Sequence, residues 1–566
     1  MADFHPLLGR TVAKRPDQSA EARRTVYDAA SAARPSAEPE VACESAAPDR
    51  DITRVETTYA ETEAAVDATM LPSGGGPATI SVAPEAPPVD ERRRLAYNAA
   101  AGGAANLVKV GIQLVLLPVM ARLLGPAEFG LYALALPTIS FFTVLADGGL
   151  GTSLAREEEA ATSVWSTAFW ALLASCTLIA LVTIAGGVML AHLSHQPRLA
   201  GIMALLSLSF PLLAISAPPA ARLVRRGNLV VHSVGDLAST LIGASVAVAL
   251  AALGAGAWAL AVQYVLGFVV RCVFLNAAAF KMPTLEFRLA SLWPHAATGG
   301  SLIGSRLSEF SGRLVENLLF GRLFGPATLG TYTFANQTSR FLCEAAGNPL
   351  WGALYSHALR EDARKVEPLH NTLSRLLASA LFPAAALMVA SAPQVFDIVL
   401  GPRWAQAAVL VQVLVPFYAL NAVAAQCGAI MLANGRNASL FWTLTGLSAG
   451  RILAVLVGPL AGPIGTAWGV DAANAAYAAV MLTSIGATTG SSAWPLVRQL
   501  LPPLVASAVA GAVCHELIGL RPESLAWTVT SLSLGGCAYL AGMILLQGRR
   551  LMADAFAIRR VVFSRR

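Results

Sequence analysis

The sequence predicts an all-α polytopic membrane protein with about 14 transmembrane helices, as two parallel six-helix repeats plus two C-terminal helices. The 566 residues are 55% hydrophobic and only 13% charged, whereas soluble domains are about 25% charged. Mean hydropathy is +0.59, and the apolar segments are continuous runs long enough to cross a bilayer. These features exclude a cytosolic enzyme, a secreted disulfide scaffold, a fibrous chain and a β-barrel.

Residues 1–90 differ in composition from the remainder. They are rich in Ala, Pro and Ser and carry 15 acidic and 8 basic residues. This segment lacks the apolar core of a signal peptide, and its low hydrophobicity cannot offset the entropy of ordering the chain. We therefore expect a disordered cytoplasmic tail, with a partner-binding arm as the alternative.

From Tyr97 onward, apolar runs alternate with short connections that contain Gly, Pro and polar residues, as at Gly125–Pro126 and Gly325–Pro326. We expect helices at 97–121, 128–148, 163–191, 199–217, 229–253, 256–279, 296–321, 329–356, 374–398, 407–432, 438–459, 462–486, 500–519 and 525–547. They divide into an N-terminal half (91–290), a C-terminal half (291–490), two additional helices (491–548) and a basic cytoplasmic tail (549–566).

The distribution of Lys and Arg among the connections predicts the orientation. With the N-terminus in the cytoplasm, the cytoplasmic side holds 20 basic residues and the opposite side 5, so both termini are expected to be cytoplasmic. The positive net charge of the chain is therefore explained by its orientation in the membrane and by contact with anionic membrane lipid. It gives no reason to expect a nucleic-acid partner. The 7 cysteines show no CxxC or CxxH spacing and predict small apolar residues rather than a metal site.

An internal repeat is the most informative feature of the sequence. ARLLGPAEFGLYALA (Ala121–Ala135) recurs as GRLFGPATLGTYTFA (Gly321–Ala335), with eight of fifteen residues identical. Weaker matches at 225–228 with 434–437, and at 256–258 with 466–468, keep the same order. Because six is even, the two halves enter the membrane in the same orientation, and such halves can enclose a cavity and rock against each other.

Polar residues inside the predicted spans are the candidate site, because charges at bilayer depth are costly and usually face a cavity or a partner. One face of the seventh span carries four charges, spaced by 3, 4 and 3 residues: Arg306, Glu309, Arg313 and Glu316. An offset of 200 places the first three on Asn106, Lys109 and Gln113 of the first span. We expect both stripes to line one hydrated central cavity; a self-neutralising structural ladder is the alternative.

Several further charges lie within the spans, with ion coupling and structural pairing both open. They are Asp147, Asp236, Asp471, the i,i+4 pair Arg340 and Glu344, and the lone cations Arg271 and Arg451. No P-loop, GxSxG motif or water-exposed carboxylate cluster appears, so we expect neither enzyme activity nor a cofactor. Energy would then come from an ion gradient or from the substrate gradient.

Several motifs, in order, carry a family resemblance. The first repeat segment followed by ADGGLGTSLARE (Ala146–Glu157), then APQVFDIVLGPRWAQAAVLVQVL (Ala392–Leu414) and ANGR (Ala433–Arg436), resemble the polysaccharide-biosynthesis or O-antigen-flippase family. That family belongs to the multidrug/oligosaccharidyl-lipid/polysaccharide exporter superfamily, and the resemblance covers roughly residues 95–490. The long tail 1–90 departs from the family's usual short N-terminus.

The resemblance implies a flippase in the bacterial inner membrane that moves polyprenyl-diphosphate-linked oligosaccharide repeat units, with a polysaccharide polymerase and glycosyltransferases as further partners. In this interpretation Lys109, Arg306 and Arg313 would attract diphosphate. Glu309 and Glu316 would balance charge or carry protons. Asn106, Gln113 and Asn317 would hydrogen-bond sugar hydroxyls.

Three alternatives remain open at this point. A cation-coupled multidrug exporter would typically have twelve spans and an acidic cavity, which the Arg-containing stripe disfavours. A non-transporting scaffold for glycan assembly would use the tail, and deletion of the tail would separate the two. A lipid-linked peptidoglycan-precursor flippase is the third alternative, separable by gene essentiality.

Overall fold

The structure is a computed structural model, and all of its described residues belong to one compact unit within Pro88–Arg566. These residues are 89–147, 154, 162–226, 229–286, 293–361, 363–489, 494–521 and 524–563. The predicted tail, apart from its last two residues, lies outside them, as does the end of the basic C-terminal segment. Within the described residues, every regular element is a helix.

The first half begins with one long element that reverses direction. Helix α4 (Val89–Asp147) contains the predicted segments 97–121 and 128–148, separated at Gly125, whose φ of 73° and ψ of 170° are not helical. Glycine reaches this positive φ without the clash a Cβ would cause. The remaining helices of this half are α6 (Thr162–Leu193), α7 (Arg198–Ser207), α8 (Ser209–Arg225), α9 (Leu229–Ala252) and α10 (Ala257–Ala279).

The second half repeats this pattern. Helix α11 (Trp293–Ala358) is interrupted at Gly325, with φ 82° and ψ 168°, and so contains the predicted segments 296–321 and 329–356. The following helices are α12 (Ala363–Leu400), α13 (Ala405–Ala424), α14 (Gln426–Ala433), α15 (Asn437–Val457), α16 (Gly462–Thr489), α17 (Trp494–Gly519) and α18 (Leu525–Phe563). Apart from end residues, the predicted segments fall in helical residues where the structure describes them, but 199–217 is divided between α7 and α8, and 407–432 between α13 and α14.

The helices have the length and the surface of membrane spans. Ten helices among the described residues are long and apolar enough to cross a bilayer. Large apolar side chains lie on their outer faces, such as Leu178, which is 62% exposed, and Leu545, which is 86% exposed; lipid, unlike water, tolerates such a surface. An all-helical membrane fold is thus confirmed, while the count of fourteen spans and the domain boundaries stay predictions.

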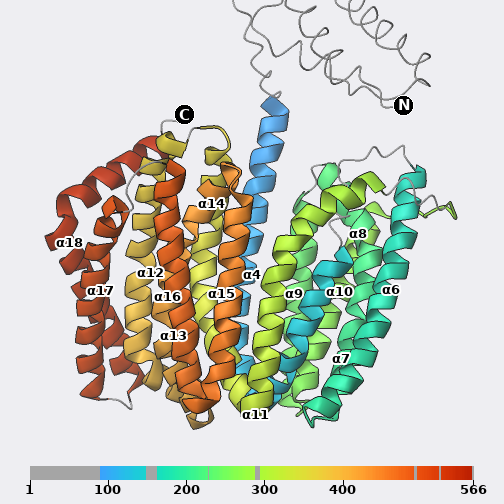
Figure 1. The fold of residues 1–566 in the computed structure, drawn as a ribbon, viewed down its shortest axis with the longest axis horizontal. Helices are drawn as coiled ribbons and strands as arrows, with labels where there is room; N and C mark the ends of the chain where they lie inside the picture. The colour runs from blue at the N-terminus through green and yellow to red at the C-terminus, as the bar shows by residue number, and fades with distance from the viewer. Residues whose placement is uncertain are drawn as a thin grey trace, which may run out of the picture. The chain divides into compact units, whose positions relative to one another are not determined.

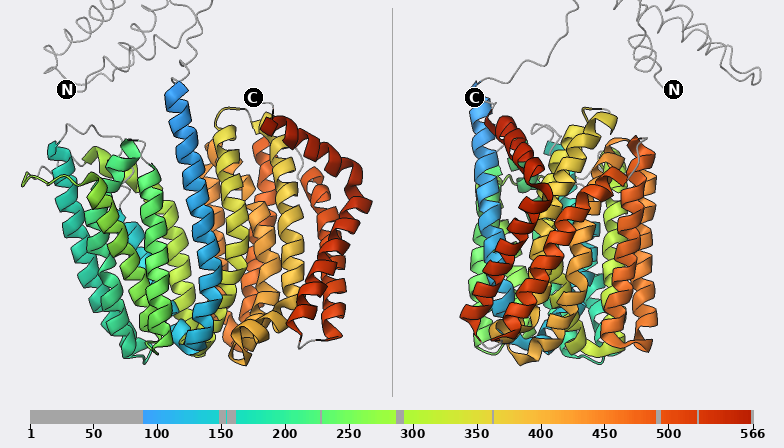
Figure 2. Two further views of the ribbon diagram at one scale, coloured as in Figure 1. Left: turned by 180° about the vertical axis from the view of Figure 1, so that it is seen from behind. Right: turned by 90° about the vertical axis from the view of Figure 1, so that its left-hand side faces the viewer.

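The two halves form two helical bundles. Figures 1 and 2 show α6–α10 gathered in one bundle and α12–α16 in the other, with α17 and α18 on the outer side of the second. Helix α17 packs against α12 and α18, and α4 packs extensively against α11. The ribbons of the two bundles approach each other at the end that contains the bends and diverge toward the end where α4 begins.

The two bends touch each other through equivalent glycines. A Cβ on Gly130 would overlap the carbonyl group of Pro326, and a Cβ on Gly330 would overlap that of Pro126. These pairs are related by the same offset of 200 residues as the sequence repeat. The repeat therefore meets itself at this end, where only glycine permits so close an approach.

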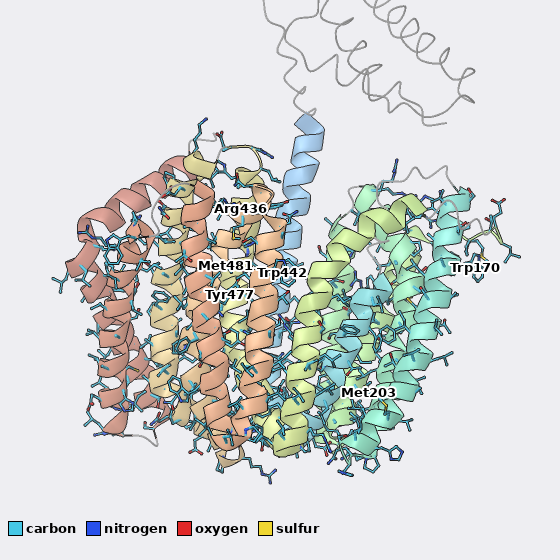
Figure 3. The ribbon with its side chains drawn as sticks, in the orientation of Figure 1. Trp170, Met203, Arg436, Trp442, Tyr477 and Met481 are labelled. Atoms are coloured by element: carbon cyan, nitrogen blue, oxygen red, sulfur yellow. The ribbon has the colours of Figure 1, made fainter. Side chains whose placement is uncertain are left out.

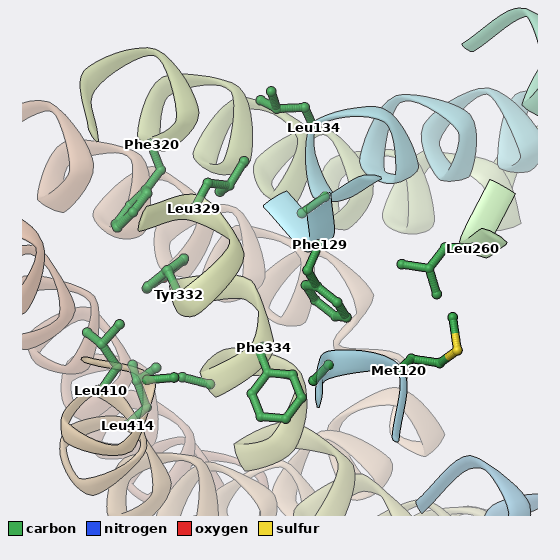
Figure 4. Close-up of a cluster of buried hydrophobic side chains, with 14 of the residues drawn as sticks. Met120, Phe129, Leu134, Leu260, Phe320, Leu329, Tyr332, Phe334, Leu410 and Leu414 are labelled. Atoms are coloured by element: carbon green, nitrogen blue, oxygen red, sulfur yellow. The ribbon is translucent and has the colours of Figure 1, made fainter. Parts of the chain in front are cut away.

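Aromatic side chains fill the space beside the bends. The rings of Phe129 and Phe334, one from each half, lie 5.7 Å apart edge to face. Trp404 packs on Phe334 at 4.7 Å, and its indole Nε1 donates a hydrogen bond of 3.1 Å to the carbonyl of Ala121. Figure 4 shows Phe129 and Phe334 between Met120 and Tyr332 within this buried cluster. It joins the halves into one closed end.

Two equivalent arginines cross from one half to the other at this end. Arg122 of α4 donates a 2.9 Å hydrogen bond to the carbonyl of Val399, at the end of α12. Arg322 of α11 donates a 2.8 Å hydrogen bond to the carbonyl of Leu193, at the end of α6. Each cation binds unsatisfied carbonyls at a helix C-terminus, where the helix dipole also favours positive charge.

Candidate functional site

A cavity of about 820 Å³ lies between the two halves. Helices α4, α9 and α10 supply its wall from the first half, and α11 and α12 supply the wall from the second. Apolar side chains of the closed end contribute to the lining: Met120, Phe129, Phe334, Phe396 and Leu400. The cavity therefore ends at the aromatic cluster beside the bends.

Charged side chains enter this cavity from three helices of the first half. Lys109 comes from α4, Asp236 from α9 and Arg271 from α10. The Arg271 Nε lies 3.5 Å from Asp236 Oδ1, and Arg271 Nη2 donates a 3.1 Å hydrogen bond to Nε2 of His232. Among the described residues of the lining, two cations thus accompany one carboxylate, an excess of one positive charge within a span, where uncompensated charge is costly.

Uncharged polar groups complete the lining. Gln113 of α4, predicted from the sequence, lies in the wall together with Gln263, Ser239 and Thr240 of the first half. Gln337 and Thr338 of α11 face the cavity from the second half. The arrangement can bind an anionic group near Lys109 and Arg271 while offering amides and hydroxyls to a hydroxyl-rich one.

A second, smaller pocket of about 240 Å³ lies within the C-terminal half, lined by α11, α13, α14, α15 and α16. It contains the predicted residues Arg313, Glu316, Arg340 and Glu344. Glu316 is buried and accepts a 2.6 Å hydrogen bond from the hydroxyl of Tyr332. Nη2 of Arg340 donates to Glu344 at 2.8 Å, so the predicted i,i+4 pair forms.

Beside this pocket, a buried polar network joins α13, α15 and α16. The side-chain oxygen of Asn474 accepts hydrogen bonds from Arg451 at 2.7 Å and from Asn421 at 3.0 Å. The Asn474 amide in turn donates to Asp471 at 3.3 Å, and Asp471 is fully buried. Asp471 therefore contributes to a network that fixes Arg451 against the pocket.

The two predicted polar stripes line two different spaces. Lys109 and Gln113 face the central cavity, whereas Arg313 and Glu316 face the pocket within the C-terminal half. Asn317, next along α11, is half-buried and lines neither. The side chains of the other predicted residues lie outside the described part of the structure: Asn106, Asp147, Arg306 and Glu309.

The cavity lining contains Arg271 and Gln337, which the sequence did not place in it: Arg271 was noted only as a lone intramembrane cation, and Gln337 was not singled out. His232, which contacts Arg271, was not singled out either. Asp236 and Arg271 carry opposite charges on consecutive spans, and that pattern was the available indication of their pairing.

The sequence and fold can now be compared with known proteins. A family model described as polysaccharide biosynthesis protein matches residues 119–409, from α4 to α13 and more than half of the chain. The chain belongs to the polysaccharide biosynthesis protein family. The matched region of this polysaccharide biosynthesis protein includes both bends and the helices of the second half that line the cavity.

Two curated relatives agree with this membership. The succinoglycan biosynthesis transport protein ExoT of Rhizobium meliloti (strain 1021) is 27% identical over 52% of this chain and 60% of its own length. The lipopolysaccharide biosynthesis protein WzxC of Escherichia coli (strain K12) is 22% identical over 72% of this chain and 86% of its own. The match to ExoT thus spans less than two thirds of that relative.

Solved structures with the same fold are transporters. The lipid II flippase MurJ, in an inward closed conformation, superposes with a TM-score of 0.65 at 11% identity, over 80% of this chain and 99% of its own. An inward-facing multidrug resistance MATE transporter gives a TM-score of 0.51 at 16% identity, over 68% and 96%. Such low identities establish the shared fold alone. Together with the ten span-length helices, the shared fold identifies a multi-pass membrane protein.

Proposed function

We propose that the protein is a flippase that moves polyprenyl-diphosphate-linked oligosaccharide repeat units across the bacterial inner membrane, from the cytoplasmic to the periplasmic leaflet, for surface or exopolysaccharide biosynthesis. The observation that carries the proposal is the polar cavity between two repeated halves, whose described lining holds the cations Lys109 and Arg271 and one carboxylate, Asp236, beside Arg271. A transporter of alternating access needs such a central site between two bodies that can move against each other.

The chemistry of the substrate fits the chemistry of the cavity. A diphosphate carries negative charge and accepts hydrogen bonds, and a guanidinium can bind it through two parallel donors. Arg271 presents such a fork, with Lys109 as a second point charge, while Gln113 and Gln337 supply amides for sugar hydroxyls. The polyprenyl chain needs no polar path, because it can stay in the lipid while the head group crosses.

The relatives support a glycan substrate. ExoT is named for transport in succinoglycan biosynthesis and WzxC for lipopolysaccharide biosynthesis. The structural neighbour MurJ is named a lipid II flippase. A multidrug exporter of cationic drugs fits less well, because Lys109 and Arg271 give the cavity a positive charge.

The charge asymmetry supports an orientation for the transport cycle. With 20 basic residues on the side of the N-terminus and 5 opposite, both termini lie in the cytoplasm. The closed end at Gly130 and Gly330 then faces the periplasm, and the halves diverge toward the cytoplasm. Glycosyltransferases would supply the substrate on that side, and a polysaccharide polymerase would receive it on the other.

The test is mass spectrometry of lipid-linked oligosaccharides in cells that lack the gene, with a stain for surface polysaccharide. We expect accumulated polyprenyl-diphosphate repeat units and loss of the polymer, both reversed by the wild-type gene. Lys109→Gln and Arg271→Gln should fail to reverse them at wild-type protein levels. The matched control is Lys365→Gln, because the Lys365 side chain is 70% exposed and outside the cavity. Unchanged lipid intermediates in cells without a second flippase would refute the proposal.

A further inference from the structure

The pocket within the C-terminal half combines a buried floor with an open mouth. Asn421 and Gln426 lie on its floor at 9% and 2% exposure, whereas Glu344 and Asn348 are exposed at its edge. The pocket shares helix α11 with the central cavity: Phe341 and Ala345 line the cavity, and Arg340 and Glu344 line the pocket. The two spaces therefore lie against different faces of the same helix.

Several buried polar atoms of this pocket have unused hydrogen-bonding capacity. Among the described residues, the side-chain oxygens of Asn421 and Gln426 accept no hydrogen bond, and the Nε of Arg451 donates none. Their other atoms are fixed: the Gln426 amide nitrogen donates to the carbonyl of Ala422 at 3.1 Å, and Asn421 and Arg451 both bind Asn474. Buried polar groups are nearly always satisfied by protein, water or a ligand, so unpaired ones that line a pocket mark a place where a polar molecule binds.

The mixture of free groups selects the chemical class of that ligand. Two acceptors and one donor require a molecule that both donates and accepts hydrogen bonds, as hydroxyl groups do. A phosphate group only accepts and a metal cation only binds acceptors, so neither would satisfy all three. Arg340 is paired with Glu344, and Arg451 is joined through Asn474 to the buried Asp471. Counted with Asp471, the three arginines Arg313, Arg340 and Arg451 meet three carboxylates, the others being Glu316 and Glu344, which favours a ligand of little net charge.

An aromatic wall completes the pattern. Trp351 lines the pocket, and Tyr355 stacks on it at 5.3 Å with an interplanar angle of 19°, which holds the indole in one orientation. Tyr477 of α16, seen in Figure 3, lines the pocket from another side. A rigid aromatic surface beside amides matches a pyranose ring, which has apolar C–H faces and a rim of hydroxyls.

We propose that this pocket is a carbohydrate subsite that holds one sugar of the glycan against Trp351, with sugar hydroxyls donating to Asn421 and Gln426 and accepting from Arg451. The proposal rests on the proposed flippase function and assigns a division of the head group: the diphosphate lies in the central cavity and a sugar lies in the C-terminal pocket. The subsite would let the transporter distinguish a completed glycan from a bare lipid carrier.

The experiment measures equilibrium binding to the full-length protein in lipid nanodiscs. Two probes are compared: the lipid-linked oligosaccharide fraction extracted from cells that lack the gene, and polyprenyl diphosphate without sugar. We expect Trp351→Ala to raise the Kd of the first probe about tenfold and to leave the Kd of the second unchanged. Trp351→Phe, which keeps a ring, should restore most of the loss. Trp442→Ala is the matched control, since Trp442 on α15 is 68% exposed and lines neither space.

A second variant keeps the proposal testable should Trp351→Ala fail to fold. Gln426→Leu removes a free acceptor at similar volume and should weaken binding of the glycan-bearing probe severalfold, again without effect on the bare carrier. Equal losses for both probes, or no loss for either variant, would overturn the subsite alone. A wild-type protein that binds neither probe would overturn the flippase function and the subsite with it.

Discussion

The N-terminal and C-terminal halves share a framework but differ in their polar interiors. The framework residues are equivalent pairs at the closed end: Gly130 with Gly330, and Arg122 with Arg322. The polar groups do not correspond in this way. In the first half Lys109, Asp236 and Arg271 open into the space between the halves. The second half contributes the uncharged Gln337 and Thr338 to that space, whereas its Arg313, Glu316, Arg340 and Glu344 line a separate pocket.

This difference indicates that the two repeats keep the same contacts at the closed end but differ in the polar side chains that can bind a ligand. A rocking transporter needs matched hinges and contacts on both sides of its axis, because the two bodies must separate and close together. A head group with a diphosphate at one end and sugars at the other presents no such symmetry. Two halves with unlike interiors can each bind one part of an unsymmetrical ligand.

The largest expected effect comes from the contact between the bends. Gly130→Ala and Gly330→Ala would each force a Cβ into a backbone carbonyl of the other half, so we expect each to destabilise the protein by about 1–3 kcal/mol. Gly111→Ala is the matched control, because nothing lies within 4 Å of its added Cβ. Thermal denaturation in detergent measures the effect, and equal melting temperatures for Gly130→Ala and Gly111→Ala would show that the bends do not touch.

The next prediction tests whether the two halves bind different parts of the ligand. Arg271→Gln should weaken binding of sugarless polyprenyl diphosphate about tenfold, since it removes a charged hydrogen-bond donor from the cavity. Arg340→Gln, in the C-terminal pocket, should leave that Kd unchanged. Titration of both variants in nanodiscs provides the comparison. If both arginines affect the bare lipid equally, the two halves do not divide the ligand as we propose.

A smaller effect is expected at the crossing arginines. Arg122→Ala and Arg322→Ala each remove hydrogen bonds that join the halves at the closed end. We expect each variant to shift the equilibrium between closed and separated halves toward separation. The shift should be only severalfold, because interactions of solvent-exposed side chains contribute little. Spin labels at Leu253→Cys and Leu460→Cys, which are exposed in equivalent connections of the two halves, would report the distance between the halves at the closed end. The labelled protein would also carry Ser in place of Cys43 and Cys537.

The two arginines provide their own comparison. By the repeat, both single variants should lengthen the distance distribution in the same direction, and the double variant should lengthen it further. A change for one arginine alone would mean that the closed end is held asymmetrically, and the matched framework would then be refuted.

The smallest effect concerns a contact that only the first half has. Glu128 accepts hydrogen bonds from Arg198 at 2.6 Å and from the backbone N–H of Ala257 at 2.7 Å, which ties α4 to the starts of α7 and α10. Thr328 occupies the equivalent position. Glu128→Gln should cost about 1 kcal/mol or less, since Arg198 is half exposed. Thermal denaturation of Glu128→Gln and of Thr328→Ala tests this prediction. A larger loss of stability for Thr328→Ala would contradict this interpretation.

The fold was accessible from sequence because the length of an apolar run reports a membrane crossing directly. The repeat also predicted the paired bends, since Gly125–Pro126 and Gly325–Pro326 recur in one motif. The site was accessible only in part. Lys109 and Gln113 line the central cavity, whereas Arg313 and Glu316 line the other pocket.

The physical reason is that a polar stripe identifies one face of a helix but not the neighbour that the face meets. Which neighbour the charged face of α11 meets depends on tertiary contacts; the buried Glu316, for example, accepts a hydrogen bond from Tyr332, which lies beyond the break at Gly325 in the second arm of α11. The contact between Arg271 and Asp236 joins consecutive helices, and their opposite charges were its indication in the sequence. The free amide oxygens of Asn421 and Gln426 depend on how α13 and α14 pack against other helices, which no pattern within a single helix reports.

The central claim is that the protein carries glycan-bearing lipid across a bilayer. The most direct measurement reconstitutes the purified protein into liposomes with lipid-linked oligosaccharides that carry a fluorescent label on the glycan, and quenches the outer leaflet with impermeant dithionite. We predict that the wild-type protein exposes label from both leaflets, whereas a Lys109→Gln, Arg271→Gln double variant leaves the inner-leaflet label protected. Protection of the inner leaflet by folded wild-type protein, with and without an ion gradient, would contradict the account.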